Sequence, residues 1–287
     1  MKKVFAGKNT LCYGNNMRLL NKIEDATIDL IYIDPPFNTG KLMKRDNYTS
    51  TKNDEGYTLG FSGQNYDLTK ISSKSYNDKF ENFTDFLKPR LIESYRVLKP
   101  NGALYLHIDY REVHYTKILL DEIFGRASFI NEIIWAYDFG ARAKKRWPAK
   151  HDNILFYAKN PKAFVFNTEL LDREPYLAPG LVTPQKAALG KLPTDVWWHT
   201  IVSPTGKEKT GYPTQKPEAI LRRIITASSN PGDMVLDFFA GSGTTGAVAA
   251  KLGRNFILGD DNTQSIEIIK DRLSTIQPSV KYKYYEV

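Results

Sequence analysis

Residues 237–246 read DFFAGSGTTG, and this stretch decides the fold of the chain. An apolar strand is predicted before it, at 234–238, and a helix after it, at 244–252. The glycines have the G-x-G-x-x-G spacing, which lets a backbone approach a nucleotide-type ligand closely, and Asp260 follows at the end of the next predicted strand. The stretch therefore predicts a strand, a cofactor-binding turn and a helix. A glycine turn that serves only tight packing is the alternative.

Strands and helices alternate on both sides of this stretch. Such alternation indicates an α/β fold with a doubly wound, mainly parallel sheet. We expect residues 41–80, which are polar, to form a long mobile loop, and residues 160–213 to form an irregular insertion. The predicted strands are 28–33, 102–108, 129–137, 153–158, 234–238 and 255–258, and the predicted helices are 84–98, 111–124, 217–229, 244–252 and 264–276.

Composition sets the broad class. With 41% hydrophobic residues, 287 residues suffice for one globular domain with its own core. No window is apolar over the length of a membrane span, and residues 1–8 show no secretory signal, so we expect a cytoplasmic protein. Cys12 is the only cysteine, so we expect no internal disulfide and no metal site. The net charge of +8 favours nucleic acid as a partner, although many basic proteins bind none.

Two cofactor classes compete for the glycine stretch. A dinucleotide would place its pyrophosphate at the start of the helix, where the carboxylate of Asp237 would repel it. S-adenosylmethionine has no phosphate, and the same acid suits the ammonium group of its methionine part. We therefore favour S-adenosylmethionine as the cofactor.

A second motif, Asp34-Pro35-Pro36-Phe37, follows the predicted strand 28–33. The two prolines fix the backbone and remove amide donors, so the carbonyl of Pro35 points in one direction. Together with the carboxylate of Asp34 it offers two acceptors to one amino group, which localises a nitrogen lone pair otherwise delocalised into an aromatic ring. Positioning and electrostatics of this kind suit methylation of an exocyclic amine, with Phe37 stacked on the base. The alternative for the tetrad is an ordinary turn.

The two motifs, in this order, resemble the β group of amino-methylating DNA methyltransferases. The resemblance implies a Rossmann-like fold, S-adenosylmethionine as the methyl donor and a catalytic half that precedes the cofactor half. We accordingly expect one methyltransferase domain over 1–287. Its parts are a catalytic half at about 1–160, a target-recognition insertion at about 161–211 and a cofactor-binding half at about 212–287.

The family's cofactor motifs also resemble shorter stretches of the chain. Thr214-Gln215-Lys216 would hold the methionine carboxylate, although Lys216 also suits a solvated position before a helix. In Gly14-Asn15 an asparagine replaces the usual aspartate of the motif that contacts the cofactor's adenine. The full set of cofactor-binding residues implied by the resemblance is Asn15, Asp34, Thr214, Gln215, Lys216, Asp237, Phe238, Ala240, Gly241, Ser242, Gly243, Thr244, Thr245 and Asp260.

The identity of the tetrad indicates the acceptor. Cytosine amino methylases more often carry Ser-Pro-Pro, so Asp34 favours the 6-amino group of adenine, with the 4-amino group of cytosine as the alternative. Methylation at the 5-position of cytosine needs a nucleophilic cysteine, typically after proline. Cys12 lies in Leu-Cys-Tyr-Gly instead, which argues against that reaction.

A basic cluster with one aromatic residue predicts the DNA contact. Trp147 lies within it, and basic side chains beside an aromatic ring suit phosphate contact and stacking; a solvated loop is the alternative. The predicted DNA-binding residues are Arg142, Lys144, Lys145, Arg146, Lys150 and His151. His151 begins a segment that resembles the motif lining the family's base pocket, and a structural histidine is an equal alternative. An amino group inside a duplex is inaccessible, so we expect base flipping.

The resemblance also implies partners. Double-stranded DNA is the expected substrate. Members of the family form homodimers, and others work beside a cognate restriction endonuclease. The family also implies a protein of prokaryotic or phage type that is associated with the nucleoid. Three other classes stay open: a methyltransferase acting on RNA or protein, a catalytically silent DNA-binding module, and an NAD-dependent oxidoreductase.

Overall fold

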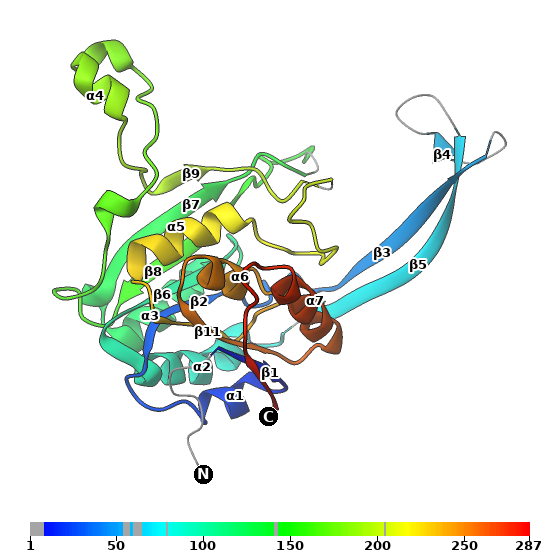
Figure 1. The fold of residues 1–287 in the computed structure, drawn as a ribbon, viewed down its shortest axis with the longest axis horizontal. Helices are drawn as coiled ribbons and strands as arrows, with labels where there is room; N and C mark the ends of the chain where they lie inside the picture. Colours follow the sequence, from blue (N-terminus) through cyan, green and yellow to red (C-terminus); the bar gives the residue numbers. More distant parts are fainter. Residues whose placement is uncertain (1–8, 54–57, 60–64, 79, 141–142, 204) are drawn as a thin grey trace.

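The computed structural model describes residues 9–53, 58–59, 65–78, 80–140, 143–203 and 205–287. Its body is a nine-stranded sheet covered by helices on both faces (Figure 1). In spatial order the strands are β12 (Lys283–Glu286), β1 (Thr10–Tyr13), β11 (Asn255–Asp260), β10 (Met234–Asp237), β2 (Ile28–Ile33), β6 (Leu98–Ile108), β8 (His151–Ala158), β7 (Phe129–Ala136) and β9 (Val196–Trp198).

The sheet is mainly parallel. Only β8 among these nine strands runs antiparallel to its neighbours, β6 and β7. The central strand β2 reads IDLIYI and is buried along its whole length, as expected for a strand covered on both faces. The predicted doubly wound α/β fold is therefore confirmed.

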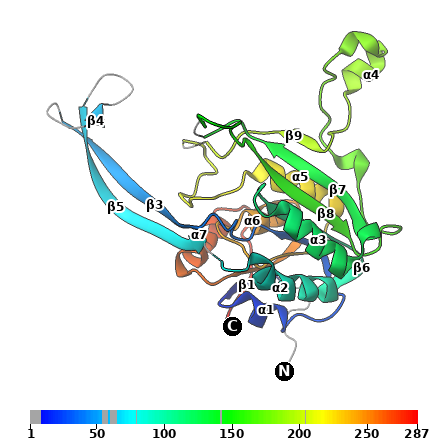
Figure 2. The same ribbon diagram turned by 180° about the vertical axis from the view of Figure 1, so that it is seen from behind.

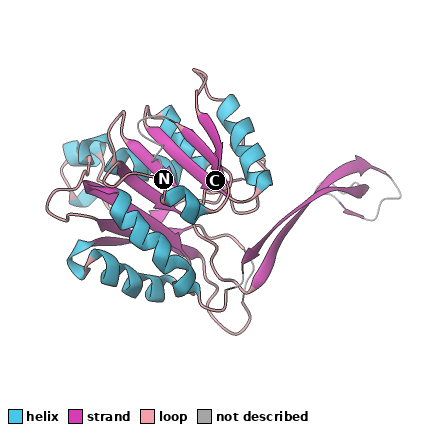
Figure 3. Cartoon of the chain, turned by 90° about the horizontal axis from the view of Figure 1, so that it is seen from below, coloured by secondary structure: helices cyan, strands magenta, loops and turns pink. Residues whose placement is uncertain are grey.

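Helices cover the sheet in two layers (Figure 3). Ile31 and Ile33 of β2 belong to the core beneath α1 (Asn16–Leu20), α2 (Phe83–Val97) and α3 (Val113–Phe124). Leu30 and Tyr32 belong to the opposite core, beneath α5 (Glu218–Ser228), α6 (Thr244–Lys251) and α7 (Thr263–Ser274). This alternation follows from the two-residue period of a strand. No helix in the described residues is long and apolar enough to cross a bilayer.

The prediction of a mobile loop at 41–80 is wrong for the residues that the structure describes there. β3 (Lys41–Lys52) pairs antiparallel with β5 (Asn65–Asp78), which also pairs with the short β4 (Thr58–Leu59). These strands form an arm that projects from the body (Figures 1 and 2). A two-stranded ribbon satisfies its backbone by pairing and needs no apolar face, so the polar composition did not reveal it.

Other elements were missed at the ends of the chain and in the insertion. The terminal strands β1 and β12 pair in parallel along one side of the sheet. The predicted irregular insertion contains α4 (Pro184–Leu189) and β9, and β9 pairs in parallel with β7 and so extends the main sheet. Strands of three and four residues lack the length that makes a sequence pattern visible.

Candidate active site

The two sequence motifs leave the sheet from neighbouring strands. β10 and β2 pair in parallel, with Val235 opposite Leu30 and Leu236 opposite Ile31. Asp237 ends β10 and Asp34 directly follows β2, so both acids lie at the same edge of the sheet. Ligands of open α/β sheets bind at this carboxyl edge.

A cavity of about 360 Å³ lies between the motifs. Both the proline tetrad and the glycine loop contribute to its wall, so residues some 200 positions apart share one space. The sequence-predicted residues that line it are Asp34, Pro35, Pro36, Phe37, Thr214, Lys216, Asp237, Phe238, Ala240, Gly241, Ser242, Thr244, Thr245 and Asp260.

Three predicted cofactor residues are not in that wall. Asn15 caps α1, where its side-chain oxygen accepts hydrogen bonds from the amides of Met17 at 3.0 Å and Arg18 at 3.4 Å. Its neighbours Gly14 and Asn16 line the cavity instead. Gly243 adopts φ 71° at the start of α6 and allows the glycine loop to turn there.

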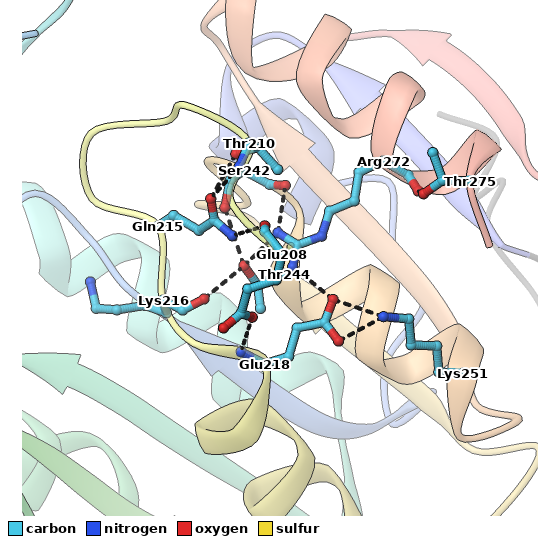
Figure 4. Close-up of polar contacts among 10 residues, drawn as sticks. All are labelled: Glu208, Thr210, Gln215, Lys216, Glu218, Ser242, Thr244, Lys251, Arg272 and Thr275. Atoms are coloured by element: carbon cyan, nitrogen blue, oxygen red, sulfur yellow. Dashed lines mark hydrogen bonds and ion pairs between the residues drawn. The ribbon is translucent and has the colours of Figure 1, made fainter. Parts of the chain in front are cut away.

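Gln215 is the third, and it organises the loop before α5 (Figure 4). Its side-chain oxygen accepts from both the amide and the hydroxyl of Thr210, each at 2.8 Å. Its side-chain nitrogen donates to the carbonyl of Glu208 at 2.5 Å. The amide is thus used within the protein and holds the loop that presents Lys216.

Asp237 is fully buried behind the glycine loop. Its carboxylate accepts hydrogen bonds from the hydroxyl of Thr245 at 2.6 Å and the amide of Phe239 at 3.0 Å. Burial raises the pKa of Asp237 to about 7 in spite of these two donors, and the charges of Asp34 and Asp260 add to the rise. A cation entering the cavity would favour the ionised form of this acid.

Asp260 ends β11 on the other side of the glycine loop. Its oxygens accept from the amides of Gly241 at 2.8 Å and Asn262 at 2.9 Å. Burial raises the pKa of Asp260 to about 6, while these two amides oppose the shift. The carboxylate fixes the loop and still faces the cavity, which suits a role toward ligand hydroxyls.

Asp34 has a different partner. One carboxylate oxygen, Oδ2, accepts a charge-assisted hydrogen bond from the ammonium group of Lys216. The other oxygen, Oδ1, is buried and has no hydrogen-bond partner among the residues described. An acceptor of this kind, at the wall of a cavity, calls for a donor from a ligand.

A buried hydrogen-bonded chain behind the tetrad was not predicted. Burial, with the charges of Asp34, Asp237 and Asp152, raises the pKa of Tyr32, and its hydroxyl shares a hydrogen bond of 2.9 Å with Nδ1 of His107. Nε2 of His107 then donates to Asp152 at 3.1 Å. The imidazole also contacts Phe37, with 5.8 Å between ring centroids. The one signal in the sequence is a histidine inside an otherwise apolar strand.

A second unpredicted group, the guanidinium of Arg90, also belongs to a residue that lines the cavity. Arg90 donates to the side-chain oxygen of Asn16 at 2.9 Å, and its guanidinium lies 3.7 Å from the ring centroid of Phe86. Burial lowers the pKa of Arg90 to about 10. No pattern in the sequence distinguishes this arginine from others on amphipathic helices.

The basic cluster lies in the loop between β7 and β8. Because β7 runs parallel to β6 and β8 antiparallel, this loop emerges at the same edge of the sheet as the two acids. Lys144, Lys145 and Arg146 are exposed, whereas Lys150 is partly covered and donates to the carbonyl of Gly140 at 2.6 Å. Arg142 lies outside the described residues.

A cavity of about 410 Å³ opens beside the cluster. It is lined by Arg146 and His151 from the predicted DNA-binding set, together with Arg111. Asp152 also lines it, so the chain of hydrogen bonds from Tyr32 reaches from the central cavity to this second one.

Comparisons with known proteins agree with this geometry. A family model described as DNA methylase, of the N6/N4 methyltransferase type, matches residues 28–271. The Type II methyltransferase M.HpaI of Haemophilus parainfluenzae is 34% identical over 271 residues, covering 92% of this chain and 74% of the relative. The DNA adenine methyltransferase YhdJ of Escherichia coli (strain K12) is 34% identical over 272 residues, covering 92% and 82%.

Solved structures share the fold at lower identity. The M1.HpyAVI complex with S-adenosylmethionine has a TM-score of 0.58 at 23% identity and covers 92% of this chain and 98% of its own. PvuII DNA methyltransferase, which is cytosine-N4-specific, has a TM-score of 0.63 at 14% identity and covers 98% and 91%. The family resemblance expected from the two motifs is confirmed. The chain therefore belongs to the N6/N4 DNA methylase family, whose methyl donor is S-adenosylmethionine.

Proposed function

We propose that the chain transfers a methyl group from S-adenosylmethionine to the 6-amino group of adenine in double-stranded DNA, after flipping that base into the central cavity. The observation that carries the proposal is the carboxylate of Asp34, which lines the same cavity as the acids of the glycine loop and whose buried Oδ1 has no hydrogen-bond partner among the described residues. The relative YhdJ, named a DNA adenine methyltransferase, supports adenine as the acceptor.

The cavity fits S-adenosylmethionine. The hydrogen bonds described for Asp237 come from a hydroxyl and an amide, both neutral, so its carboxylate still lacks a cation, and the cofactor's ammonium would supply one. Asp260 would bind the ribose hydroxyls. When bound, S-adenosylmethionine offers a methyl group on a sulfonium, and the sulfide product keeps the electron pair of the broken carbon–sulfur bond.

The tetrad would prepare the amino group. Oδ1 of Asp34 and the carbonyl of Pro35 would each accept one amino hydrogen, which localises the nitrogen lone pair toward the methyl group. As the nitrogen–carbon bond forms, the nitrogen must release one proton, and Oδ1 is placed to receive it and pass it to solvent. Phe37, held against His107 at 5.8 Å, would form the floor on which the base stacks.

DNA would lie over the carboxyl edge of the sheet. The exposed cluster of Lys144, Lys145 and Arg146 emerges there and would bind phosphates. Insertion 161–211, from which α4 projects in Figure 1, would read the target sequence within a single domain of 1–287. A homodimer and a cognate restriction endonuclease stay predictions from the family.

The test is transfer of a radiolabelled methyl group from S-adenosylmethionine to mixed-sequence duplex DNA, followed by nucleoside analysis. We expect label in 6-methyladenine and none with Asp34→Ala. Label in 4-methylcytosine would make cytosine, and not adenine, the acceptor base. Faster labelling of RNA than of DNA in a competition would make RNA the substrate. Equal labelling by Asp34→Ala would remove the acid from the mechanism.

A further inference from the structure

Lys216 connects the two walls of the active site. Its ammonium group donates to Oδ2 of Asp34 although the two residues are 182 positions apart. The ammonium also lies 5.1 Å from the ring centroid of Phe37, at the other end of the tetrad. Both side chains of the ion pair are mostly buried, with 12% of Lys216 and 17% of Asp34 exposed. Limited solvent screening makes such a pair strongly orienting.

This placement differs from the role expected of the motif. The sequence resemblance gave Lys216 to the carboxylate of the cofactor, whereas the structure gives its ammonium to the catalytic acid. With Oδ2 held by a cation, rotation of the carboxylate is restricted, and Oδ1 is left as the buried oxygen to which no described residue donates. The pair therefore selects which oxygen keeps its capacity to accept a hydrogen bond.

The backbone of Lys216 is fixed by the cofactor wall. The hydroxyl of Thr244, in the first turn of α6, donates to the carbonyl of Lys216 at 3.2 Å. Arg272 of α7 donates to that hydroxyl at 2.9 Å and to the carbonyl of Ser242 at 3.3 Å. Figure 4 shows this cluster, with the carbonyl of Lys216 turned toward Thr244 and its ammonium turned away.

The same arginine ties down the helix that follows Lys216. Arg272, which is 8% exposed, donates to Glu218 in the first turn of α5 at 3.0 Å. Glu218 also pairs with Lys251 of α6 at 2.6 Å, and its amide donates to Glu208 at 2.9 Å. The loop that carries Lys216 is thus held against the glycine loop from both sides.

We propose that Lys216 is a positioning residue for Asp34. Its ammonium fixes Oδ2 so that Oδ1 receives the target amino group, and its backbone sets this geometry from the glycine loop. The proposal rests on the proposed function. Lys216 acts through Asp34 and not through the affinity for the cofactor.

The experiment separates binding from transfer in Lys216→Met, which keeps the length of the side chain. Calorimetry gives the dissociation constant of S-adenosylmethionine, and single-turnover transfer at saturating cofactor and DNA gives the rate. We expect a dissociation constant within about threefold of the parent and a rate about 100-fold lower, as for the loss of one preorganised polar contact. Lys216→Arg should recover part of the rate. Lys281→Met, an exposed lysine just before β12 and so at the opposite edge of the sheet, is the matched control and should leave both numbers unchanged.

A double-mutant cycle with Asp34→Asn decides the case in which both numbers change. If Lys216 acts through Asp34, the double variant is no slower than Asp34→Asn alone. Rates that multiply, or a raised dissociation constant with an unchanged saturated rate, would overturn the proposal and return Lys216 to the cofactor. Thermal unfolding checks that each variant folds, and Lys216→Gln replaces the methionine variant if that one does not.

Failure of the proposed function would look different. In that case the parent chain labels no DNA, whatever residue stands at 216. A crystal structure of Lys216→Met then still tests the inference: a rotated carboxylate of Asp34 supports it, and a carboxylate in the parent orientation overturns it.

Discussion

Two acids at the tips of neighbouring strands show how one sheet edge supports two kinds of chemistry. Asp34 follows β2 and Asp237 ends β10, and the two strands pair in parallel. Asp34 is paired with a cation, and its Oδ1 has no hydrogen-bond partner in the described part of the chain. Asp237 is 2% exposed and accepts from a hydroxyl and an amide. Environment, and not residue type, separates an oriented acceptor from an acid poised to bind a cation.

The backbones that follow the two acids also differ, because one contains prolines and the other contains glycines. Pro35 and Pro36 fix φ at the exit from β2, so the backbone that follows Asp34 is stiff by covalent restriction. The exit from β10 turns through Gly241 at φ 51° and Gly243 at φ 71°. Those angles turn the loop so that the amide of Gly241 donates to the carboxylate of Asp260 at 2.8 Å. Stiffness serves direction at one acid, and close approach serves binding at the other.

The largest expected effect comes from Asp34→Asn. The amide keeps the shape but loses the charge that attracts the amino hydrogens, so single-turnover methyl transfer should fall about 100- to 1000-fold. The dissociation constant of the cofactor should stay within about threefold of the parent value.

Asp237→Asn should show the reverse, with a cofactor affinity about 30-fold lower and a smaller loss of the saturated rate, because it removes an acid expected to hold an ammonium. Equal effects of both variants on affinity would erase the distinction between the walls.

Gly243→Ala tests the turn of the glycine loop through its effect on the stability of the protein. A Cβ at this position would lie 2.8 Å from Cγ1 of Ile269, and the residue has φ 71°. Both strains act together, so we expect a loss of about 2 kcal/mol and a melting temperature lower by roughly 5 °C in scanning calorimetry. Gly180→Ala is the control, since a Cβ there meets nothing within 4 Å. An unchanged melting temperature for Gly243→Ala would show that the turn needs no glycine.

The raised pKa of Asp237 predicts a pH dependence of cofactor binding. At pH 6, with a pKa of about 7, most of this acid is protonated and cannot attract an ammonium, whereas at pH 8 most is ionised. Calorimetry should therefore give a dissociation constant about tenfold higher at pH 6 than at pH 8. The difference should shrink in Asp237→Asn. The part that stays belongs to Asp260, with its pKa of about 6. If the dissociation constant depended on pH equally in Asp237→Asn, the titrating group would be a different residue.

The same shift fixes the sign of its contribution to folding. The pKa of Asp237 rises from 3.8 to about 7, so between these values the folded state holds a proton that the unfolded state has lost. The resulting stabilisation of the folded state is fully present below pH 3.8 and is lost as the pH rises to about 7. The free energy of unfolding of Asp237→Asn should lack this part of the decline in urea titrations.

The sequence predicted the centre of the molecule better than its periphery. Residues 28–33 and 234–238 are mostly apolar strands, followed by prolines in the first case and by glycines in the second, so both the strands and the turns carry local signals. The arm of β3 and β5 was missed because strand pairing between residues 41 and 78 depends on partners, not on an apolar period. Composition alone favoured a loop there.

Within the site, chemistry that depends on distant contacts was invisible. Tyr32, His107 and Asp152 come from three strands, and only their pairing in the sheet brings the ring nitrogens of His107 to a hydroxyl and a carboxylate. The motif containing Lys216 was found, but its ammonium meets Asp34 because two loops meet in space. Motifs thus locate residues, while their partners follow from the topology.

The smallest expected effect lies outside both walls, in the basic cluster. Lys144 is exposed on the loop that emerges at the carboxyl edge of the sheet, so in the proposed function its charge would act on DNA through release of counterions and not through a fixed bond. Lys144→Gln should weaken DNA binding about threefold and lower the slope of log affinity against log salt by about 0.9, measured by fluorescence anisotropy. Lys283→Gln, exposed at the start of β12, which runs parallel to β1 and so begins at the opposite edge, should change neither. Cofactor affinity should be the same in both variants, because a surface charge outside the cavity contacts neither acid. An unchanged salt slope in Lys144→Gln would place the phosphate contacts on other residues of the same edge.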